Sequence, residues 1–248
     1  MKSIFFAATL LLAFSVSAQA PVAVPIPQEP HHHLVLENDY VRVFRVSVPA
    51  HESTLLHQHD VPYLYVSLGP ADVINAVQGK PEAHLVMVDG QLGYSPGHFA
   101  HIARNDSDLP FNNVTIELLK PQKNPHNICR EVIPGAVRDC SGPPITRIPD
   151  FPDKGLPLFE TGEVFVQEVY IPKRPNHAGL LEGPDVLLVA LANPNLKLRV
   201  PGQPSVKLAT GAVTWLTAGQ KCSISAPRGV PLHFLLLTFS DGTAVARP

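Results

Sequence analysis

The chain has 248 residues, a net charge of −2 and only 16 % charged residues, with Lys and Arg scattered along the sequence. A protein that binds nucleic acid concentrates positive charge on one surface, so this distribution argues against such a partner. The 27 prolines and the lack of long helical periodicity favour short strands joined by loops, and we expect an all-β protein.

Residues 1–18 have the features of a cleaved signal peptide. Lys2 supplies the positive charge, residues 4–16 form an apolar stretch, and small residues precede a cleavage site after Ala18. Cleavage two residues later would leave Pro21 directly after the cut, a poor position for the peptidase. The apolar stretch is shorter than the roughly 18 residues that a membrane-spanning helix needs, and no later segment is long enough. We therefore expect a secreted or periplasmic protein without a membrane partner.

Residues 19–33 form a segment rich in proline and histidine, which we expect to be extended and a poor core former. Its triplet His31-His32-His33 has two interpretations: a flexible polar segment, or an arm that captures copper or zinc. We prefer the first interpretation.

The histidines of His57-Gln58-His59, together with His101 about forty residues later, form the pattern that carries the most chemistry. Two histidines one residue apart in a strand point to the same face, because strand side chains alternate with period two. The turn signal Pro96-Gly97 precedes a second strand, which brings His101. Three imidazoles that meet at one point suit a transition metal with open coordination positions.

These residues resemble the two sequence motifs of the cupin superfamily. The first motif is matched by the pair of histidines, and the second by four further residues: Pro96, Gly97, His101 and Asn105. The Glu that the family carries after the first pair is missing, and the matching positions hold Tyr63 and Leu64. The resemblance covers residues 34–121 and implies a jelly-roll barrel of the double-stranded β-helix type. Tyr63 is the catalytic candidate in place of the Glu, as a weak metal ligand or as a hydrogen-bond donor.

We expect His57, His59 and His101 to hold one divalent transition metal. Imidazole ligands suit copper, iron and zinc, and copper has the highest intrinsic affinity for such sites. Export also favours copper, because ferrous iron oxidises readily outside the cytoplasm; we rank copper first, then iron, then zinc. Without the Glu the metal charge is uncompensated, so we expect the site to prefer an anionic ligand.

The chain also repeats itself. A shift of 123 residues places residues 36–49 on residues 159–172, and the register continues until residues 64–68 meet residues 187–191. Turn residues and alternating apolar positions recur at matching places, as a duplicated strand-rich unit requires. The predicted fold is therefore two tandem cupin-type barrels, at residues 34–121 and 158–248.

The repeat also makes a prediction about chemistry. All three imidazoles are replaced in the second copy, by Leu180, Glu182 and Ser223, the last after a one-residue slip in register. We therefore expect the second barrel to be degenerate and metal-free. Residues 122–157 form a proline-rich linker that we expect to pack along both barrels.

The three cysteines cannot all pair with one another. Cys129 and Cys140 lie close together in the linker, either as a disulfide in an oxidising compartment or as two free thiols. Cys222 lies in an alternating stretch, and we expect it to be a small buried residue.

The resemblance implies a metal-dependent oxidoreductase, most simply a dioxygenase-type enzyme. Its substrate would be a small organic molecule that chelates the metal through oxygen: a phenolic, a diketone or a carbohydrate-derived compound. Two alternatives remain open, a secreted binding protein without catalytic activity and a zinc- or nickel-dependent lyase or isomerase. Cupins also commonly dimerise, so a homodimer is implied by the resemblance alone.

Overall fold

The computed structural model describes residues 22–124, 126–127, 129–144, 146, 157–172, 179–191 and 196–240. The predicted signal peptide, residues 1–18, lies outside this part of the chain. Within it, one 3-10 turn, η1 (Ile26–Gln28), is accompanied by strands alone, so the all-β prediction is confirmed. No helix among these residues is long and apolar enough to cross a membrane.

The N-terminal barrel, barrel 1, consists of two sheets. The five-stranded sheet has the order β1 (Val24–Pro25), β4 (His57–His59), β9 (Phe99–Asn105), β6 (Ala71–Val77), β7 (Ala83–Met87). The seven-stranded sheet has the order β12 (Arg130–Ile133), β13 (Val137–Asp139), β8 (Leu92–Ser95), β5 (Tyr63–Ser67), β10 (Phe111–Leu118), β3 (Val41–Val48), β2 (His32–Glu37).

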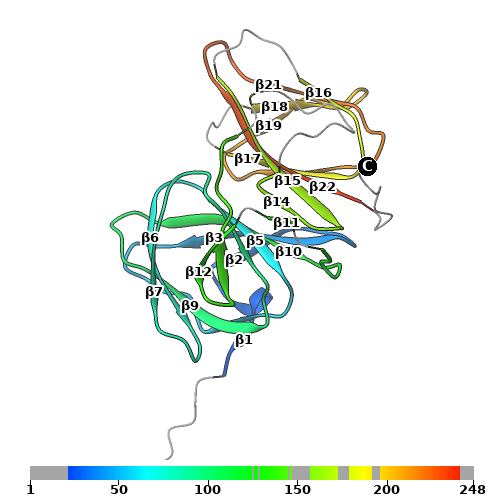
Figure 1. Ribbon diagram of the computed structural model, residues 1–248. Coiled ribbons are helices and arrows are strands. Elements are labelled where there is room, and N and C mark those ends of the chain that lie inside the picture. The colour runs from blue at the N-terminus through cyan, green and yellow to red at the C-terminus, as the bar shows by residue number, and fades with distance from the viewer. Residues whose placement is uncertain are drawn as a thin grey trace, which may run out of the picture.

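The C-terminal barrel, barrel 2, is also built from two sheets and forms the second lobe in Figure 1. Its six-stranded sheet has the order β11 (His126–Asn127), β14 (Phe159–Glu160), β15 (Val164–Ile171), β22 (Leu232–Phe239), β17 (Val186–Ala190), β20 (Val213–Leu216). Its four-stranded sheet has the order β16 (Gly179–Leu181), β21 (Cys222–Ser225), β18 (Leu196–Arg199), β19 (Val206–Leu208).

The two barrels share one strand order, which confirms the duplication predicted from the sequence. The run β8-β5-β10-β3-β2 in barrel 1 corresponds to β20-β17-β22-β15-β14 in barrel 2, and β4-β9-β6-β7 corresponds to β16-β21-β18-β19. The 123-residue shift carries Val41, the first residue of β3, onto Val164, the first residue of β15. The fold is therefore two tandem jelly-roll barrels.

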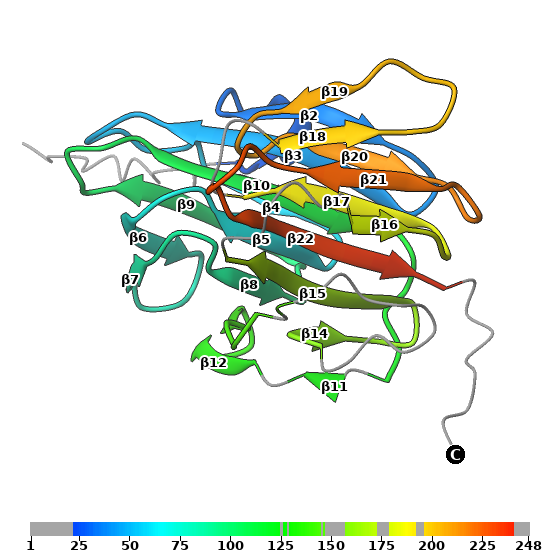
Figure 2. The same ribbon diagram turned by 90° about the horizontal axis from the view of Figure 1, so that it is seen from above.

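The seven-stranded sheet of barrel 1 packs against the six-stranded sheet of barrel 2 (Figure 1), and their strands run along one another when seen from above (Figure 2). Val114 and Ile116 of β10 share one apolar cluster with Leu235 and Leu237 of β22. Thr115, between the first two, lines the interior of barrel 1. Because this sheet is buried on both faces, the chain needs few charged residues there.

The N-terminal segment differs from the prediction. Residues predicted as an extended arm, at 19–33, include β1, which pairs in parallel with β4, and the start of β2, which pairs with β3. The predicted barrel boundary at residue 34 therefore falls inside β2. Two physical reasons account for this: Ile26 packs into the interior of barrel 1, and prolines are tolerated in a strand at the edge of a sheet.

The linker contributes strands to both barrels. β11 pairs with β14 in barrel 2, whereas β13 pairs with β8 and, with β12, extends the seven-stranded sheet of barrel 1. Cys129 and Cys140 form a disulfide with their Cα atoms 4.0 Å apart. Cys222 is buried, and burial raises the pKa of its thiol to about 11.

Removing the disulfide should destabilise the linker end of barrel 1. The double variant Cys129→Ser/Cys140→Ser is expected to lower the free energy of unfolding by about 3 kcal/mol, because the bond closes a short loop in the unfolded chain. Urea unfolding of the oxidised wild type and of the variant measures this difference. Reduced wild type is the control and should match the variant. A loss below about 0.5 kcal/mol would mean that the bond does not constrain the unfolded chain.

Candidate metal centre

Three predicted histidines meet inside barrel 1. His57 and His59 lie on β4 and point inward on the same face, and His101 on β9 lies directly opposite His57 in the antiparallel pair. Ring centroids lie 4.4 Å apart for His57 and His101, 5.1 Å for His57 and His59, and 5.2 Å for His59 and His101. All three side chains are buried. The structure therefore brings these three imidazoles together, as the strand alternation requires.

A fourth imidazole, which was not among the predicted ligands, joins this cluster. The ring of His32, on β2, lies 4.8 Å from that of His57 and 6.3 Å from that of His59. One nitrogen from each of His32, His57 and His59 lies within 4.8 Å of the others, a spacing that could hold a metal ion. The histidine triplet is the one sequence signal for this residue, and the place of His32 beside His57 depends on the long-range pairing of β2 with β3.

The nitrogens of the cluster divide into held and unpaired atoms. The Nδ1–H of His57 donates to the carbonyl of Leu55 at 2.9 Å, and the Nδ1–H of His101 donates to the side-chain oxygen of Asn75 at 2.9 Å. Among the residues that the structure describes, three buried nitrogens make no hydrogen bond: His57 Nε2, His59 Nδ1 and His101 Nε2. Each such atom costs about 1–3 kcal/mol when nothing compensates it. His57 and His101 each combine a held Nδ1 with an unpaired Nε2, the arrangement that metal-ligating imidazoles show.

The electrostatics keep the imidazoles neutral. Burial, followed by repulsion from His32, lowers the pKa of His57 to about 4. Burial and neighbouring imidazoles place the pKa values of His59 and His101 well below the usual value. Neutral rings retain the lone pair that a metal ligand needs.

Two carboxylates, Glu29 and Glu117, lie next to imidazoles of the cluster. The sequence analysis did not connect them with it. Burial alone would raise the pKa of Glu29, but hydrogen bonds from His32 and His31 lower it to about 2, so the group is anionic. Glu117 lies 4.0 Å from His59 Nδ1 and forms an ion pair with Arg42 at 2.7 Å. The sequence analysis expected that the charge of a bound metal would be uncompensated. The structure differs, because the anionic Glu29 lies close to the cluster.

Tyr63 lies flat against His59. The ring centroids are 3.9 Å apart with an angle of 20° between the planes, and the phenol hydrogen-bonds with the side chain of Ser95. Burial raises the pKa of Tyr63, so the phenol stays protonated. This arrangement fixes the plane of the His59 ring. A catalytic role for Tyr63 stays a prediction.

The imidazoles line one part of a cavity of about 50 Å³. The rest of its wall combines four polar residues, Thr54, Asn75, Asn113 and Thr115, with aromatic and apolar residues that include Val46, Val73, Leu85, Met87 and Phe111. One buried water needs about 10–15 Å³ of such space, so the cavity has room for a few waters or for a small part of a substrate.

The corresponding position in barrel 2 offers different chemistry. Leu180 pairs with Ser223 there, as His57 pairs with His101 in barrel 1. Glu182 is about half exposed and forms an ion pair with Lys221 at 3.3 Å. The variant Glu182→Ala is therefore expected to leave the metal content of the purified protein unchanged, as measured by elemental analysis. Loss of the metal would show that barrel 2 takes part in binding it.

Neither a protein-family profile nor a curated protein sequence matches this chain. Among solved structures, AerE from Microcystis aeruginosa is 10 % identical with a TM-score of 0.56, over 86 % of this chain and 99 % of AerE. Salicylate 1,2-dioxygenase from Pseudaminobacter salicylatoxidans is 12 % identical with a TM-score of 0.55, over 84 % of this chain and 76 % of that enzyme. A cupin 2 conserved barrel domain protein from Leptotrichia buccalis is 10 % identical with a TM-score of 0.48, over 91 % and 92 %.

Identities this low show a shared fold only, so the chemistry of the site has to be argued from the residues of this chain. The fold itself is consistent at three levels: the repeated strand order, the inward-facing histidines on β4 and β9, and the likeness to solved structures over most of the chain. The chain therefore has the cupin fold, in the form of two tandem barrels.

Proposed function

We propose that this protein is a metal-dependent oxidoreductase of the dioxygenase type, with its metal held in barrel 1 by His57, His59 and His101. The observation that carries this proposal is the meeting of three buried imidazoles from β4 and β9, with ring centroids no more than 5.2 Å apart, each with one nitrogen that makes no hydrogen bond within the described part of the chain. A similar fold in salicylate 1,2-dioxygenase supports the reaction class, and one solved variant of that enzyme is a complex with gentisate.

The residues of the chain have separate parts in this proposal. Bound copper or iron would supply Lewis acidity and redox chemistry at the imidazole cluster. The carbonyl of Leu55 and the amide of Asn75 hold His57 and His101 in the tautomer that exposes Nε2. Tyr63 fixes the plane of His59, and the apolar part of the wall, which includes Val73 and Met87, favours an apolar part of the substrate over water.

We propose as substrate a small organic molecule that presents one or two oxygens to the site, such as a phenolic, a diketone or a carbohydrate-derived compound. The narrow cavity favours entry of the reacting end of such a molecule over enclosure of a large one. We also propose that the mature protein is secreted or periplasmic, that copper is its metal ahead of iron and zinc, and that it forms a homodimer.

The test is metal analysis of the purified mature protein, followed by oxygen uptake with phenolic, diketone and sugar substrates. We expect about one copper or iron per chain and oxygen consumption that depends on substrate. His101→Ala should abolish both, whereas His98→Ala should retain both, because His98 is exposed at the turn before β9. Stoichiometric zinc without oxygen uptake would instead favour a lyase or isomerase. A protein without metal would favour a binding protein.

A further inference from the structure

We infer that His32 is a fourth metal-ligating residue and that Glu29 anchors it, so that residues 29–32 replace the carboxylate missing from the first motif. This inference rests on the proposed metal centre of barrel 1 and adds a ligand from outside the two motifs. The ring centroid of His32 lies 4.8 Å from that of His57. One nitrogen from each of His32, His57 and His59 lies within 4.8 Å of the other two.

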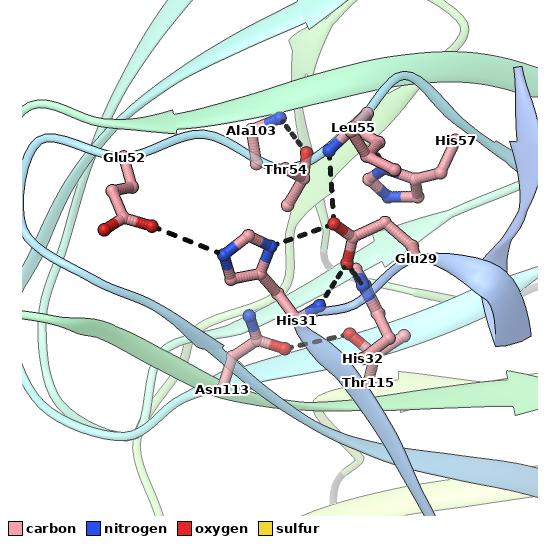
Figure 3. A network of polar contacts seen from close by, with 10 residues as sticks. All are labelled: Glu29, His31, His32, Glu52, Thr54, Leu55, His57, Ala103, Asn113 and Thr115. Atoms are coloured by element: carbon pink, nitrogen blue, oxygen red, sulfur yellow. Dashed lines mark hydrogen bonds and ion pairs between the residues drawn. The ribbon is translucent and has the colours of Figure 1, made fainter.

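Glu29 holds His32 in the orientation that a ligand needs. The Nδ1–H of His32 donates to Glu29 Oε2 at 2.5 Å, which leaves Nε2 with its lone pair free to bind a metal. The carboxylate also accepts from the ring of His31 at 2.9 Å and from the backbone N–H of Leu55 at 3.1 Å (Figure 3). The backbone N–H of His31 is a fourth donor, at 2.9 Å, and a fully buried carboxylate with four donors is fixed in place, so the ring that it holds is fixed as well.

The same carboxylate connects two arms of the cluster. The backbone N–H of Leu55 donates to Glu29 (Figure 3). Its carbonyl accepts the Nδ1–H of His57. Glu29 therefore holds His32 directly and His57 through one residue, Leu55. Its negative charge lies one imidazole away from the proposed metal position, where it offsets the charge that three neutral imidazoles leave uncompensated.

The fold explains why this arm comes from the N-terminal segment. β1 pairs with β4 at Val24 and His57, and β2 pairs with β3 at His32 and Val46. These two pairings place η1, whose C-terminal cap is Glu29, between β1 and β2 and in contact with β4, the strand that carries His57. Neighbouring His33 is exposed on the same strand and serves as a matched control.

The test compares His32→Ala and Glu29→Gln with two controls, His33→Ala and Glu182→Gln, on the full mature chain; Glu182 lies in barrel 2 and pairs with Lys221. Zinc and copper(II) are the probes, with affinity measured by chelator competition. We expect a loss of about 10- to 100-fold for Glu29→Gln, the range for a partner that supports a ligand, and about 100-fold or more for His32→Ala. The controls should stay within about threefold of the wild type. His32→Gln, which keeps the size of the side chain, replaces His32→Ala if circular dichroism shows that the latter is unfolded.

A spectroscopic measurement separates a ligand from a neighbour. In copper(II)-loaded wild type, the nitrogen hyperfine pattern in electron paramagnetic resonance should require one more imidazole than in the His32 variant. An unchanged pattern and affinity in that variant would overturn the inference while leaving the proposed metal centre intact. A wild type that binds neither probe would instead overturn the proposed function, and the inference with it.

Discussion

Zinc at about 1,000 times its dissociation constant is expected to raise the free energy of unfolding of the mature protein by about 4 kcal/mol. The ion binds the folded state, where the unpaired nitrogens of His57, His59 and His101 are held together, and an unfolded chain presents no such cluster. Urea unfolding with and without zinc measures the gain.

Tryptophan fluorescence can follow this unfolding from barrel 2, the barrel that does not carry the imidazoles. Trp215, the single tryptophan of the chain, lies in β20 of barrel 2 and stacks on Tyr40 of barrel 1 with ring centroids 5.5 Å apart. Because the barrels share an apolar cluster, tryptophan fluorescence should report the zinc-dependent shift as fully as circular dichroism does.

The matched variants of this experiment are His59→Ala and His98→Ala. His59→Ala should abolish zinc binding and with it the whole gain in stability, whereas His98→Ala should retain the gain. A full zinc-dependent shift in His59→Ala would show that the metal binds elsewhere. Separate transitions for fluorescence and circular dichroism would show that the barrels unfold independently.

Leu237→Asp is expected to lower the free energy of unfolding by more than about 4 kcal/mol, through loss of a buried leucine and burial of an unpaired carboxylate. Leu237 is fully buried in the cluster that joins the two barrels. The control is Val206→Asp, on the edge strand β19, because Val206 is about half exposed. This control should change stability by less than about 0.5 kcal/mol. Urea unfolding of both variants measures the difference, and equal midpoints would mean that the interface between the barrels adds little.

Local patterns were sufficient for the parts of the structure that depend on neighbouring residues. Strand alternation placed His57 and His59 on one face of β4, and the 123-residue repeat predicted that β15 would match β3.

Long-range pairing accounts for what the sequence did not reveal. His32 reaches the cluster because β2 joins the far edge of the seven-stranded sheet, and Glu29 because η1 follows the parallel pair of β1 with β4. The prolines around these residues argued for an extended arm, yet an edge strand accommodates prolines, and the apolar contacts of Ile26 fix the segment. Asn75 likewise meets His101 only through the pairing of β6 with β9.

The seven-stranded sheet is buried on one face by the interior of barrel 1 and on the other by barrel 2, so barrel 1 depends on barrel 2 to cover its apolar surface. A fragment that ended at residue 121 would expose Val43, Leu64 and Ile116 as a bare apolar face, and such a face invites self-association. The half that carries the imidazoles is therefore not an independent module. Barrel 2 can do without a metal site, but it must keep the apolar face that covers the seven-stranded sheet of barrel 1.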